Sequence, residues 1–237
     1  MNKLFAVRAA AVFALFFALV LAWPSAARAF WLLGFSPADT LAPGSVSLIS
    51  GTGAQFTQVG NAPRDSFTAF LPHAGFRVGL ADGLDIGYRL TQVALPFSSV
   101  GPSLGGELDA KWRLTPAASL WQAALVGGFA YSGLEIENSA RSAWSPGVDL
   151  VLSRKVANLD AIFTEFRYIY TAIPTAFGGA ADNYLNAVGL GEGFKIGLTS
   201  STSVIPELGL YRLDGEMARA DASGWALQVG AVVSQRW

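Results

Sequence analysis

The sequence has no cysteine, only one histidine and few charged residues. Without cysteine the fold uses neither disulfide bonds nor thiolate metal ligands, and with His73 alone a zinc or haem site is not expected. Charged residues make up 14% of the chain, against about 25% in ordinary soluble domains. The composition therefore predicts a protein with no metal or other cofactor and with an unusually apolar exterior.

Long apolar runs are also missing, except near the N-terminus. There, two basic residues precede the apolar run 9–22, and a small-x-small cleavage site follows at Ala27-Arg28-Ala29. We predict that residues 1–29 are a cleaved signal peptide, which leaves 237 − 29 = 208 residues beginning at Phe30. No later uncharged stretch reaches the roughly 20 residues that a membrane-spanning helix needs.

An excess of positive charge is missing as well. Three of the 16 basic residues lie in the predicted signal peptide, which contains none of the 17 acidic residues, so the mature chain carries 13 − 17 = −4. Proteins that bind nucleic acid need a basic patch to neutralise phosphates. No nucleic-acid partner is therefore expected.

What the chain does contain is alternation of apolar and polar residues, which is typical of β-strands. Between residues 74 and 93, Phe76, Val78 and Leu80 alternate with glycine and arginine. Asp82-Gly83 then provides a tight turn, and the alternation resumes. One face of this predicted hairpin is apolar, and the other carries charge, glycine and hydroxyl groups.

Residues 104–114 separate their two faces even more clearly. Leu108, Trp112 and Leu114 belong to one side, and four charged residues belong to the other. A helix would distribute these charges around its circumference, whereas a strand places them all on one face. This segment is therefore predicted to be a strand between an apolar and a polar environment.

Ten strands of about ten residues each are predicted, and their connections alternate in length. The strands cover 45–57, 74–80, 84–93, 104–114, 121–131, 147–153, 161–170, 185–198, 204–213 and 225–237. Short turns near 81–83, 115–119, 154–158 and 199–202 alternate with longer segments near 58–67, 94–102, 133–145, 171–184 and 213–223. The pattern predicts an all-β fold, an antiparallel up-and-down barrel over 44–237, with both termini on the side of the short turns. Eight or twelve strands are alternative counts, and a soluble lipocalin-type barrel is the alternative architecture.

Parts of the sequence resemble a known class of proteins. Residues 75–88, residues 109–114 and the terminal Trp237 are similar to the hairpins, strands and assembly signal of Gram-negative outer-membrane β-barrel proteins. The resemblance implies a transmembrane barrel in the cell outer membrane, in contact with lipid and lipopolysaccharide. It also implies binding to the barrel-assembly machinery through the C-terminal strand, where Trp237, Val233 and Val229 would form the signal. Residues 30–43 would form a periplasmic segment tucked under the barrel mouth.

Twelve charged side chains fall on the predicted inner face of the barrel. They are Arg77, Asp85, Arg89, Glu107, Asp109, Lys111, Arg113, Asp149, Glu165, Arg167, Lys195 and Glu207. We interpret them as a salt-bridged polar network that fills the lumen, and the alternative is a polar path for a small solute. Eight-stranded barrels are filled by their own side chains, whereas 16–18 strands leave an aqueous channel. Ten strands lie near the filled end, so no large conductance is expected.

Glu192 does not fit the alternation. Counting back from the apolar Phe194, its side chain would point toward lipid, where a charge is costly. Glycines at 189, 191 and 193 would permit a β-bulge that turns Glu192 inward. We predict such a bulge.

The sequence provides little support for an enzyme. His73 follows Pro72 near the start of a strand, and no Gly-x-Ser-x-Gly nucleophile motif occurs. We therefore predict a small, largely closed, non-enzymatic barrel with a structural or adaptor role. The alternative is a narrow outer-membrane channel for small or hydrophobic solutes, and a lipid-modifying barrel enzyme comes third.

Overall fold

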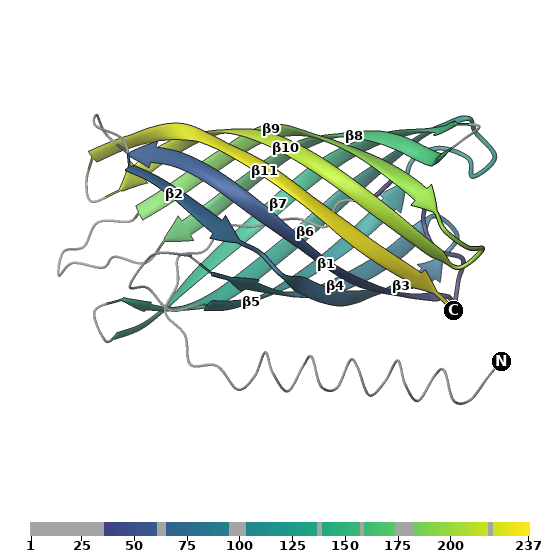
Figure 1. Cartoon of the computed structure of the whole chain (residues 1–237), viewed down its shortest axis with the longest axis horizontal. Helices are drawn as coiled ribbons and strands as arrows, with labels where there is room; N and C mark the ends of the chain where they lie inside the picture. Colours follow the sequence, from purple (N-terminus) through teal and green to yellow (C-terminus); the bar gives the residue numbers. More distant parts are fainter. Residues whose placement is uncertain are drawn as a thin grey trace.

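The computed structural model describes residues 36–60, 65–94, 103–136, 139–156, 159–173, 183–217 and 220–237. In these ranges it contains eleven strands and no helix (Figure 1). They are β1 (Val46–Gly60), β2 (Asp65–Phe70), β3 (His73–Ala81), β4 (Leu84–Val93), β5 (Ser103–Arg113), β6 (Trp121–Ile136), β7 (Ser139–Val156), β8 (Leu159–Ile173), β9 (Asn183–Gly197), β10 (Thr202–Met217) and β11 (Ala220–Arg236). The predicted signal peptide lies outside the described residues.

Strand β1 closes the barrel. One of its edges pairs antiparallel with β11, and its other edge pairs with β3 near the start of β1 and with β2 farther along. β2 and β3 therefore share one position in the wall, and the closed barrel has ten strand positions. The two segments are separated at Leu71-Pro72, where proline offers no N–H to the ladder. Leu71 still donates its N–H to the carbonyl of Gly53, at 2.8 Å.

Three of the predicted long loops are in large part strand. In segment 58–67, β1 runs to Gly60 and β2 begins at Asp65. In segment 133–145, Ile136 pairs with Ser139, and in segment 213–223, Met217 pairs with Ala220. Strands β6, β7, β10 and β11 are 16, 18, 16 and 17 residues long, more than the roughly 9–11 needed to span a bilayer. A strand that continues beyond the lipid meets water on both faces. Its alternation then disappears, and sequence reasoning takes it for a loop.

The outer face of the wall is apolar. Large side chains at alternate positions are exposed on it, among them Leu108 at 57% and Trp112 at 61%. A row of aromatic rings crosses four neighbouring strands, with centroid separations of 6.4 Å from Phe129 to Trp144, 5.6 Å to Tyr170 and 6.0 Å to Tyr184. An apolar belt with aromatic residues at its border is the exterior of a barrel that lies in lipid. The alternative of a soluble barrel with its apolar face inward is thereby excluded.

No helix among the described residues is long and apolar enough to cross a membrane.

The register around Glu192 contains no bulge, so that prediction was wrong. Glu192 pairs with Thr164 of β8 and with Leu208 of β10, and the pairing keeps one register on both sides. The Glu192 side chain is exposed on the outer face, where it accepts a hydrogen bond from the Thr164 hydroxyl at 2.8 Å. A polar neighbour on the same face, rather than a change of register, accommodates this carboxyl group. The backbone of β10 also passes Pro206 without a register shift.

The inner face differs between the two ends of the barrel. At the end of the barrel opposite Trp237, it presents a buried apolar cluster of Val59, Leu185, Leu213, Ala222 and Ala226. Nearer Trp237, the inner face carries the charged residues, beside a second buried apolar cluster that includes Phe163 and Ile205. The lumen therefore has an apolar half and an ionic half, and the second contains the candidate site.

Candidate functional site

All twelve charged residues that the sequence placed on the inner face lie there. Ten of them are buried, and the side chains of Arg77 and Arg113 are only 12% and 10% exposed. They come from seven strands, β3 to β5 and β7 to β10. Strand alternation delivers them to the lumen, because their positions on each strand share one parity.

Arg77 connects two acids of neighbouring strands. Its guanidinium forms ion pairs with Asp85 of β4 and with Asp109 of β5. The other carboxylate oxygen of Asp85 accepts the backbone N–H of Leu41 at 3.0 Å. A fork of N–H donors suits an arginine to such bridging.

Arg167 is the centre of a second ionic group. Its side chain is fully buried and binds Asp149 at 2.7 Å and Glu165 at 2.6 Å, and it donates to the Tyr211 hydroxyl at 3.1 Å. Hydrogen bonds then continue along the inner face through uncharged side chains of the neighbouring strands β10, β11 and β1, from Tyr211 to Gln228 at 3.4 Å and from Gln228 to Gln55 at 3.5 Å. On this side of the wall, the relay lies between the ionic half of the lumen and the apolar half.

Arg89 and Glu107 form a third pair between adjacent strands. The guanidinium and the carboxylate are 2.6 Å apart and almost fully buried. Burial without a partner would be costly for either charge. The pair therefore gives each of the two buried groups a partner of opposite charge.

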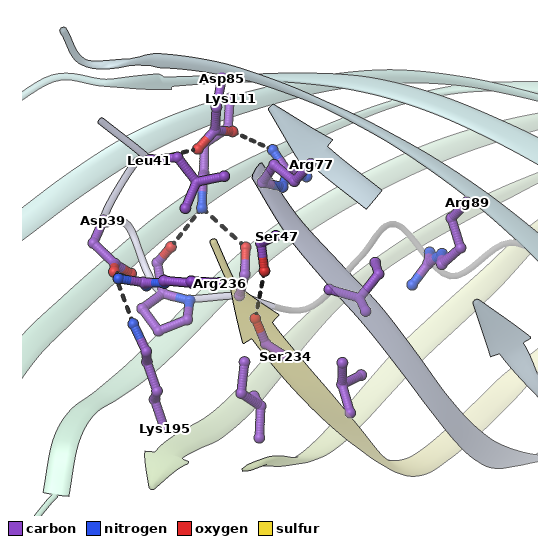
Figure 2. Close-up of a pocket in the computed structure, with 15 residues that line it drawn as sticks. Asp39, Leu41, Ser47, Arg77, Asp85, Arg89, Lys111, Lys195, Ser234 and Arg236 are labelled. Atoms are coloured by element: carbon purple, nitrogen blue, oxygen red, sulfur yellow. Dashed lines mark hydrogen bonds and ion pairs between the residues drawn. The ribbon is translucent and has the colours of Figure 1, made fainter. Parts of the chain in front are cut away.

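The segment before β1 enters the lumen and binds this network. The Lys111 ammonium donates to the Ser36 hydroxyl at 3.1 Å and to the Pro37 carbonyl at 3.0 Å (Figure 2). The Ala38 N–H donates to the Ser153 hydroxyl at 3.2 Å, and Ala38 has no exposed surface. The sequence placed residues 30–43 beneath the barrel mouth. Residues 36–41 lie inside it, residues 42 and 43 are exposed, and residues 30–35 lie outside the described residues.

Asp39 anchors the same segment to two strands. Its carboxylate binds Lys195 of β9 at 2.8 Å and Arg236 of β11 at 2.9 Å (Figure 2). Burial opposes ionisation of Asp39, but the positive charges of Lys195, Lys111 and Arg236 outweigh it. Together they hold the pKa of this carboxyl group well below its ordinary value. The carboxylate is therefore ionised at neutral pH and acts as a fixed point of attachment.

A small cavity is found in this half of the lumen. A cavity of about 60 Å³ lies between the segment and the wall, bordered by Ile49, Arg77, Arg89 and Ile205 among others (Figure 2). One water molecule needs roughly 10–15 Å³ of such space. The cavity has room for a few water molecules and does not have the size of a solute channel.

His73 is buried and does not belong to a catalytic pair in the described residues. Its Nδ1 lies 3.1 Å from the Leu71 carbonyl. Its Nε2 is directed over Gly51, where an added Cβ would be only 2.6 Å away. Within the described ranges Nε2 has no hydrogen-bond partner, and no group of three histidine or acidic residues could hold a metal ion.

The C-terminal residues that the sequence named as an assembly signal lie on the outer face. Val229, Val233 and Trp237 are each exposed by 37–46%. The backbone N–H of Trp237 donates to the Val46 carbonyl at 2.9 Å, which secures the end of the chain to the closing strand.

The closed wall, the apolar exterior and the ionic interior define the class of protein. It is an outer-membrane β-barrel, as the resemblance implied. No protein-family model and no curated protein sequence matches the chain.

Several solved structures are similar in fold. The outer membrane protease OmpT from Escherichia coli is 13% identical with a TM-score of 0.48, and the match covers 84% of this chain and all of that one. The N-terminal β-barrel domain of OprF from Pseudomonas aeruginosa is 12% identical, with a TM-score of 0.38 and coverages of 82% and 99%. The translocator domain of the autotransporter NalP from Neisseria meningitidis is 11% identical, with a TM-score of 0.41 and coverages of 84% and 91%.

Proposed function

We propose that this protein is a closed, non-conducting barrel with a structural or adaptor role in the outer membrane. The observation that carries the proposal is the segment from Ser36 to Leu41, which occupies the lumen. It is bonded there to β4, β5, β7, β8, β9 and β11. A stable solute path would require these bonds to break together.

The energetics of the ionic half support a permanently filled lumen. Removing one partner of a buried pair leaves an uncompensated charge, at a cost of about 3–5 kcal/mol. Arg167 alone has two buried acidic partners, and Arg77 has two more. An ion that entered would have to displace such partners, so it would meet a large barrier.

Conductance in planar bilayers tests this proposal. We expect no stable openings for the mature protein. A variant that lacks residues 36–42 should show ion-conducting openings, because it loses the attachments of Lys111, Lys195 and Asp85 to the segment. Arg154→Ala provides a matched control, since Arg154 lies on the outer face over the Trp121 ring. Stable, porin-sized openings of the unaltered protein would contradict the proposal.

A second candidate function is a narrow path for hydrophobic solutes. It is favoured by the apolar lining of the distant half, where Val59, Leu185 and Leu213 face the lumen. Uptake of an apolar dye into liposomes that contain the barrel distinguishes the two functions. Uptake that falls in a Leu213→Asp variant would support the channel, and no uptake above empty liposomes supports the closed barrel.

We also propose that the barrel is not an enzyme. The strongest catalytic candidate, His73, is buried against Gly51 and Leu71, on a side of the wall that lipid does not reach. We expect no hydrolysis of phospholipid or lipid A. Hydrolysis that is lost in a folded His73→Ala variant would overturn this assignment.

Lipid, lipopolysaccharide and the assembly machinery are the proposed partners. The apolar belt supports the first two, and the outward Val229, Val233 and Trp237 support recognition of the C-terminal strand. We expect a Trp237→Ala variant to accumulate unassembled in the periplasm. Unchanged assembly would exclude Trp237 as part of the signal.

A further inference from the structure

The cavity between the segment before β1 and the barrel wall is bordered by more basic than acidic side chains. Five basic residues and two acidic residues contribute to its lining. They are Arg77, Arg89, Lys111, Lys195, Arg236, Asp39 and Asp85 (Figure 2). The balance of charge around this space is therefore positive.

The two acids are already bonded within the protein. One carboxylate oxygen of Asp85 accepts from Arg77, and the other accepts the backbone N–H of Leu41. Asp39 binds the two basic residues that come from β9 and β11. Neither acid is therefore left to neutralise the remaining cations at the cavity.

Lys111 is a buried cation with no acid beside it. Its residue is only 2% exposed. Two of the ammonium hydrogens bind the Ser36 hydroxyl and the Pro37 carbonyl. Among the described residues, the third has no acceptor, and no carboxylate lies within ion-pair distance of the ammonium group. Because buried charges are normally paired, Lys111 requires a negative charge from another source.

Arg89 provides a second donor at the same cavity. Its guanidinium pairs with Glu107 through one terminal nitrogen, at 2.6 Å. Its Nε–H is buried, and in the described part of the chain it has no hydrogen-bond partner. Glu207 acts on Arg89 electrostatically from outside the cavity lining and forms no ion pair with it. Figure 2 shows the Arg89 guanidinium directed toward the other residues of the lining. A buried N–H donor without an acceptor is rare in proteins.

A pair of hydroxyl groups adds a third donor. Ser47 and Ser234 border the cavity, and their hydroxyl oxygens are 2.8 Å apart. Only one of the two can donate to the other, so the second hydroxyl hydrogen remains for a third group. The lining thus offers donors in excess of acceptors. A water molecule would bring two more hydrogens that need acceptors, whereas an anion only accepts.

We propose that this cavity binds one small monovalent anion of the halide type. Lys111, Arg89 and a hydroxyl of the Ser47–Ser234 pair donate to it. The single unpaired charge of Lys111 matches one negative charge. A volume of about 60 Å³ holds an ion of about the size of a water molecule together with a few waters, but it excludes bulky organic acids.

The bound anion would stabilise the segment before β1. Lys111 holds Ser36 and Pro37 directly, and an anion beside it offsets the cost of burying its charge. The site depends on the position of this segment, as the proposed closed barrel does. The test below measures no conductance, so its failure would leave the closed barrel unaffected.

The dependence of stability on chloride tests the proposal. The mature barrel is unfolded by urea in micelles, with chloride replaced stepwise by gluconate at constant ionic strength so that general screening does not change. Above the dissociation constant, the unfolding equilibrium constant should fall about tenfold for each tenfold rise in chloride, as expected for one ion that binds only the folded state. Equal stability in the two salts would show that water satisfies the donors, and would overturn the proposal.

Two variants identify the groups that hold the ion. Lys111→Met should abolish the dependence on chloride. Arg89→Lys keeps a positive charge opposite Glu107 but loses the Nε donor, so it should need about tenfold more chloride for the same effect. Arg154→Met on the outer face is the control and should respond as the unaltered protein does. Heat-modifiable migration in gels verifies folding, and an unchanged response in folded Lys111→Met would exclude this site.

Bromide locates the ion without any substitution. Crystals of the mature barrel grown in sodium bromide should show an anomalous scattering peak within the lumen, beside the Lys111 ammonium and the Arg89 guanidinium. Peaks confined to the outer surface would indicate an adventitious ion only. That result, or no peak at all, would contradict the proposal.

Discussion

Near Trp237 the lumen is filled by paired charges and by the segment before β1, whereas an apolar cluster that includes Leu185 and Leu213 lines the opposite end. The hydrogen bonds from Arg167 through Tyr211 and Gln228 to Gln55 lie between the two regions on one side of the wall. Ion pairs require a specific partner at a specific position, but an apolar cluster requires only matching volume. One uniform wall is therefore filled by two different kinds of interaction, which should respond differently to substitution and to pH.

The largest effect is expected in the ionic half. Arg167→Met removes the partner of two buried acids, and we expect a loss of about 3–5 kcal/mol in the free energy of unfolding. Unfolding by urea in detergent micelles, followed by tryptophan fluorescence, measures it. The control is Arg154→Met on the outer face, where a much smaller loss is expected. Equal losses in the two variants would show that the Arg167 network does not stabilise the barrel.

The apolar half should show the cost of lost volume rather than of lost charge. Leu213 is 1% exposed within its cluster, and Leu213→Ala should destabilise by about 2–4 kcal/mol. Leu210→Ala is the matched control, because Leu210 lies three residues earlier on β10 and is half exposed toward lipid. The same urea titration compares them. A larger loss for Leu210→Ala would show that contacts on the outer face stabilise this part of the barrel more than the inner cluster does.

Packing also matters within the ionic half, where the Phe163 ring covers Gly193. A Cβ at Gly193 would lie 2.2 Å from that ring, so Gly193→Ala should cost about 1–3 kcal/mol through displacement of Phe163. At Gly127 an added Cβ meets nothing within 4 Å, so Gly127→Ala is expected to be nearly neutral. Urea unfolding midpoints test the difference, and equal effects would argue against tight packing at Phe163.

The smallest effect concerns Asp39 and its dependence on pH. Asp39→Asn removes the ion pairs with Lys195 and Arg236, and we expect a loss of about 1 kcal/mol at neutral pH, since Arg236 is exposed. The pKa of Asp39 is lowered in the folded state, so its contribution is present above the unfolded value of about 3.9. It is lost as the pH falls through the folded value.

Unfolding midpoints of both proteins between pH 7 and pH 2 provide the measurement for Asp39. The advantage of the unaltered protein over Asp39→Asn should shrink toward the acid end. A constant difference across this range would mean that ionisation of Asp39 does not hold the segment in place.

Much of the wall could be predicted from the sequence. Regular alternation in segments such as 104–114 indicated both the strands and the face that carries charge, because a strand has a strict period of two. The closed ten-stranded barrel and its outer-membrane location followed from the same pattern. Where strands leave the lipid, as at 133–136 and 213–217, alternation was lost and the prediction failed.

The candidate site was predictable only in its charged members. Ser36 and Asp39 lie before the first strand in a segment without periodicity, so no local pattern indicated that they bind Lys111 and Lys195. Tyr211 and Gln228 are uncharged, so the pattern of charges did not indicate them. Their role depends on contacts between side chains of different strands.

The order of residues alone dictates which side chains face lipid and which face the axis, since strand geometry alternates them without help from the rest of the chain. Closure of the wall decides everything that depends on several strands at once: the partners of Arg77 and Arg167, the entry of the segment before β1, and the outward carboxyl of Glu192 beside Thr164. Such contacts depend on which strands pair and in which register, so they exist only after the wall has formed.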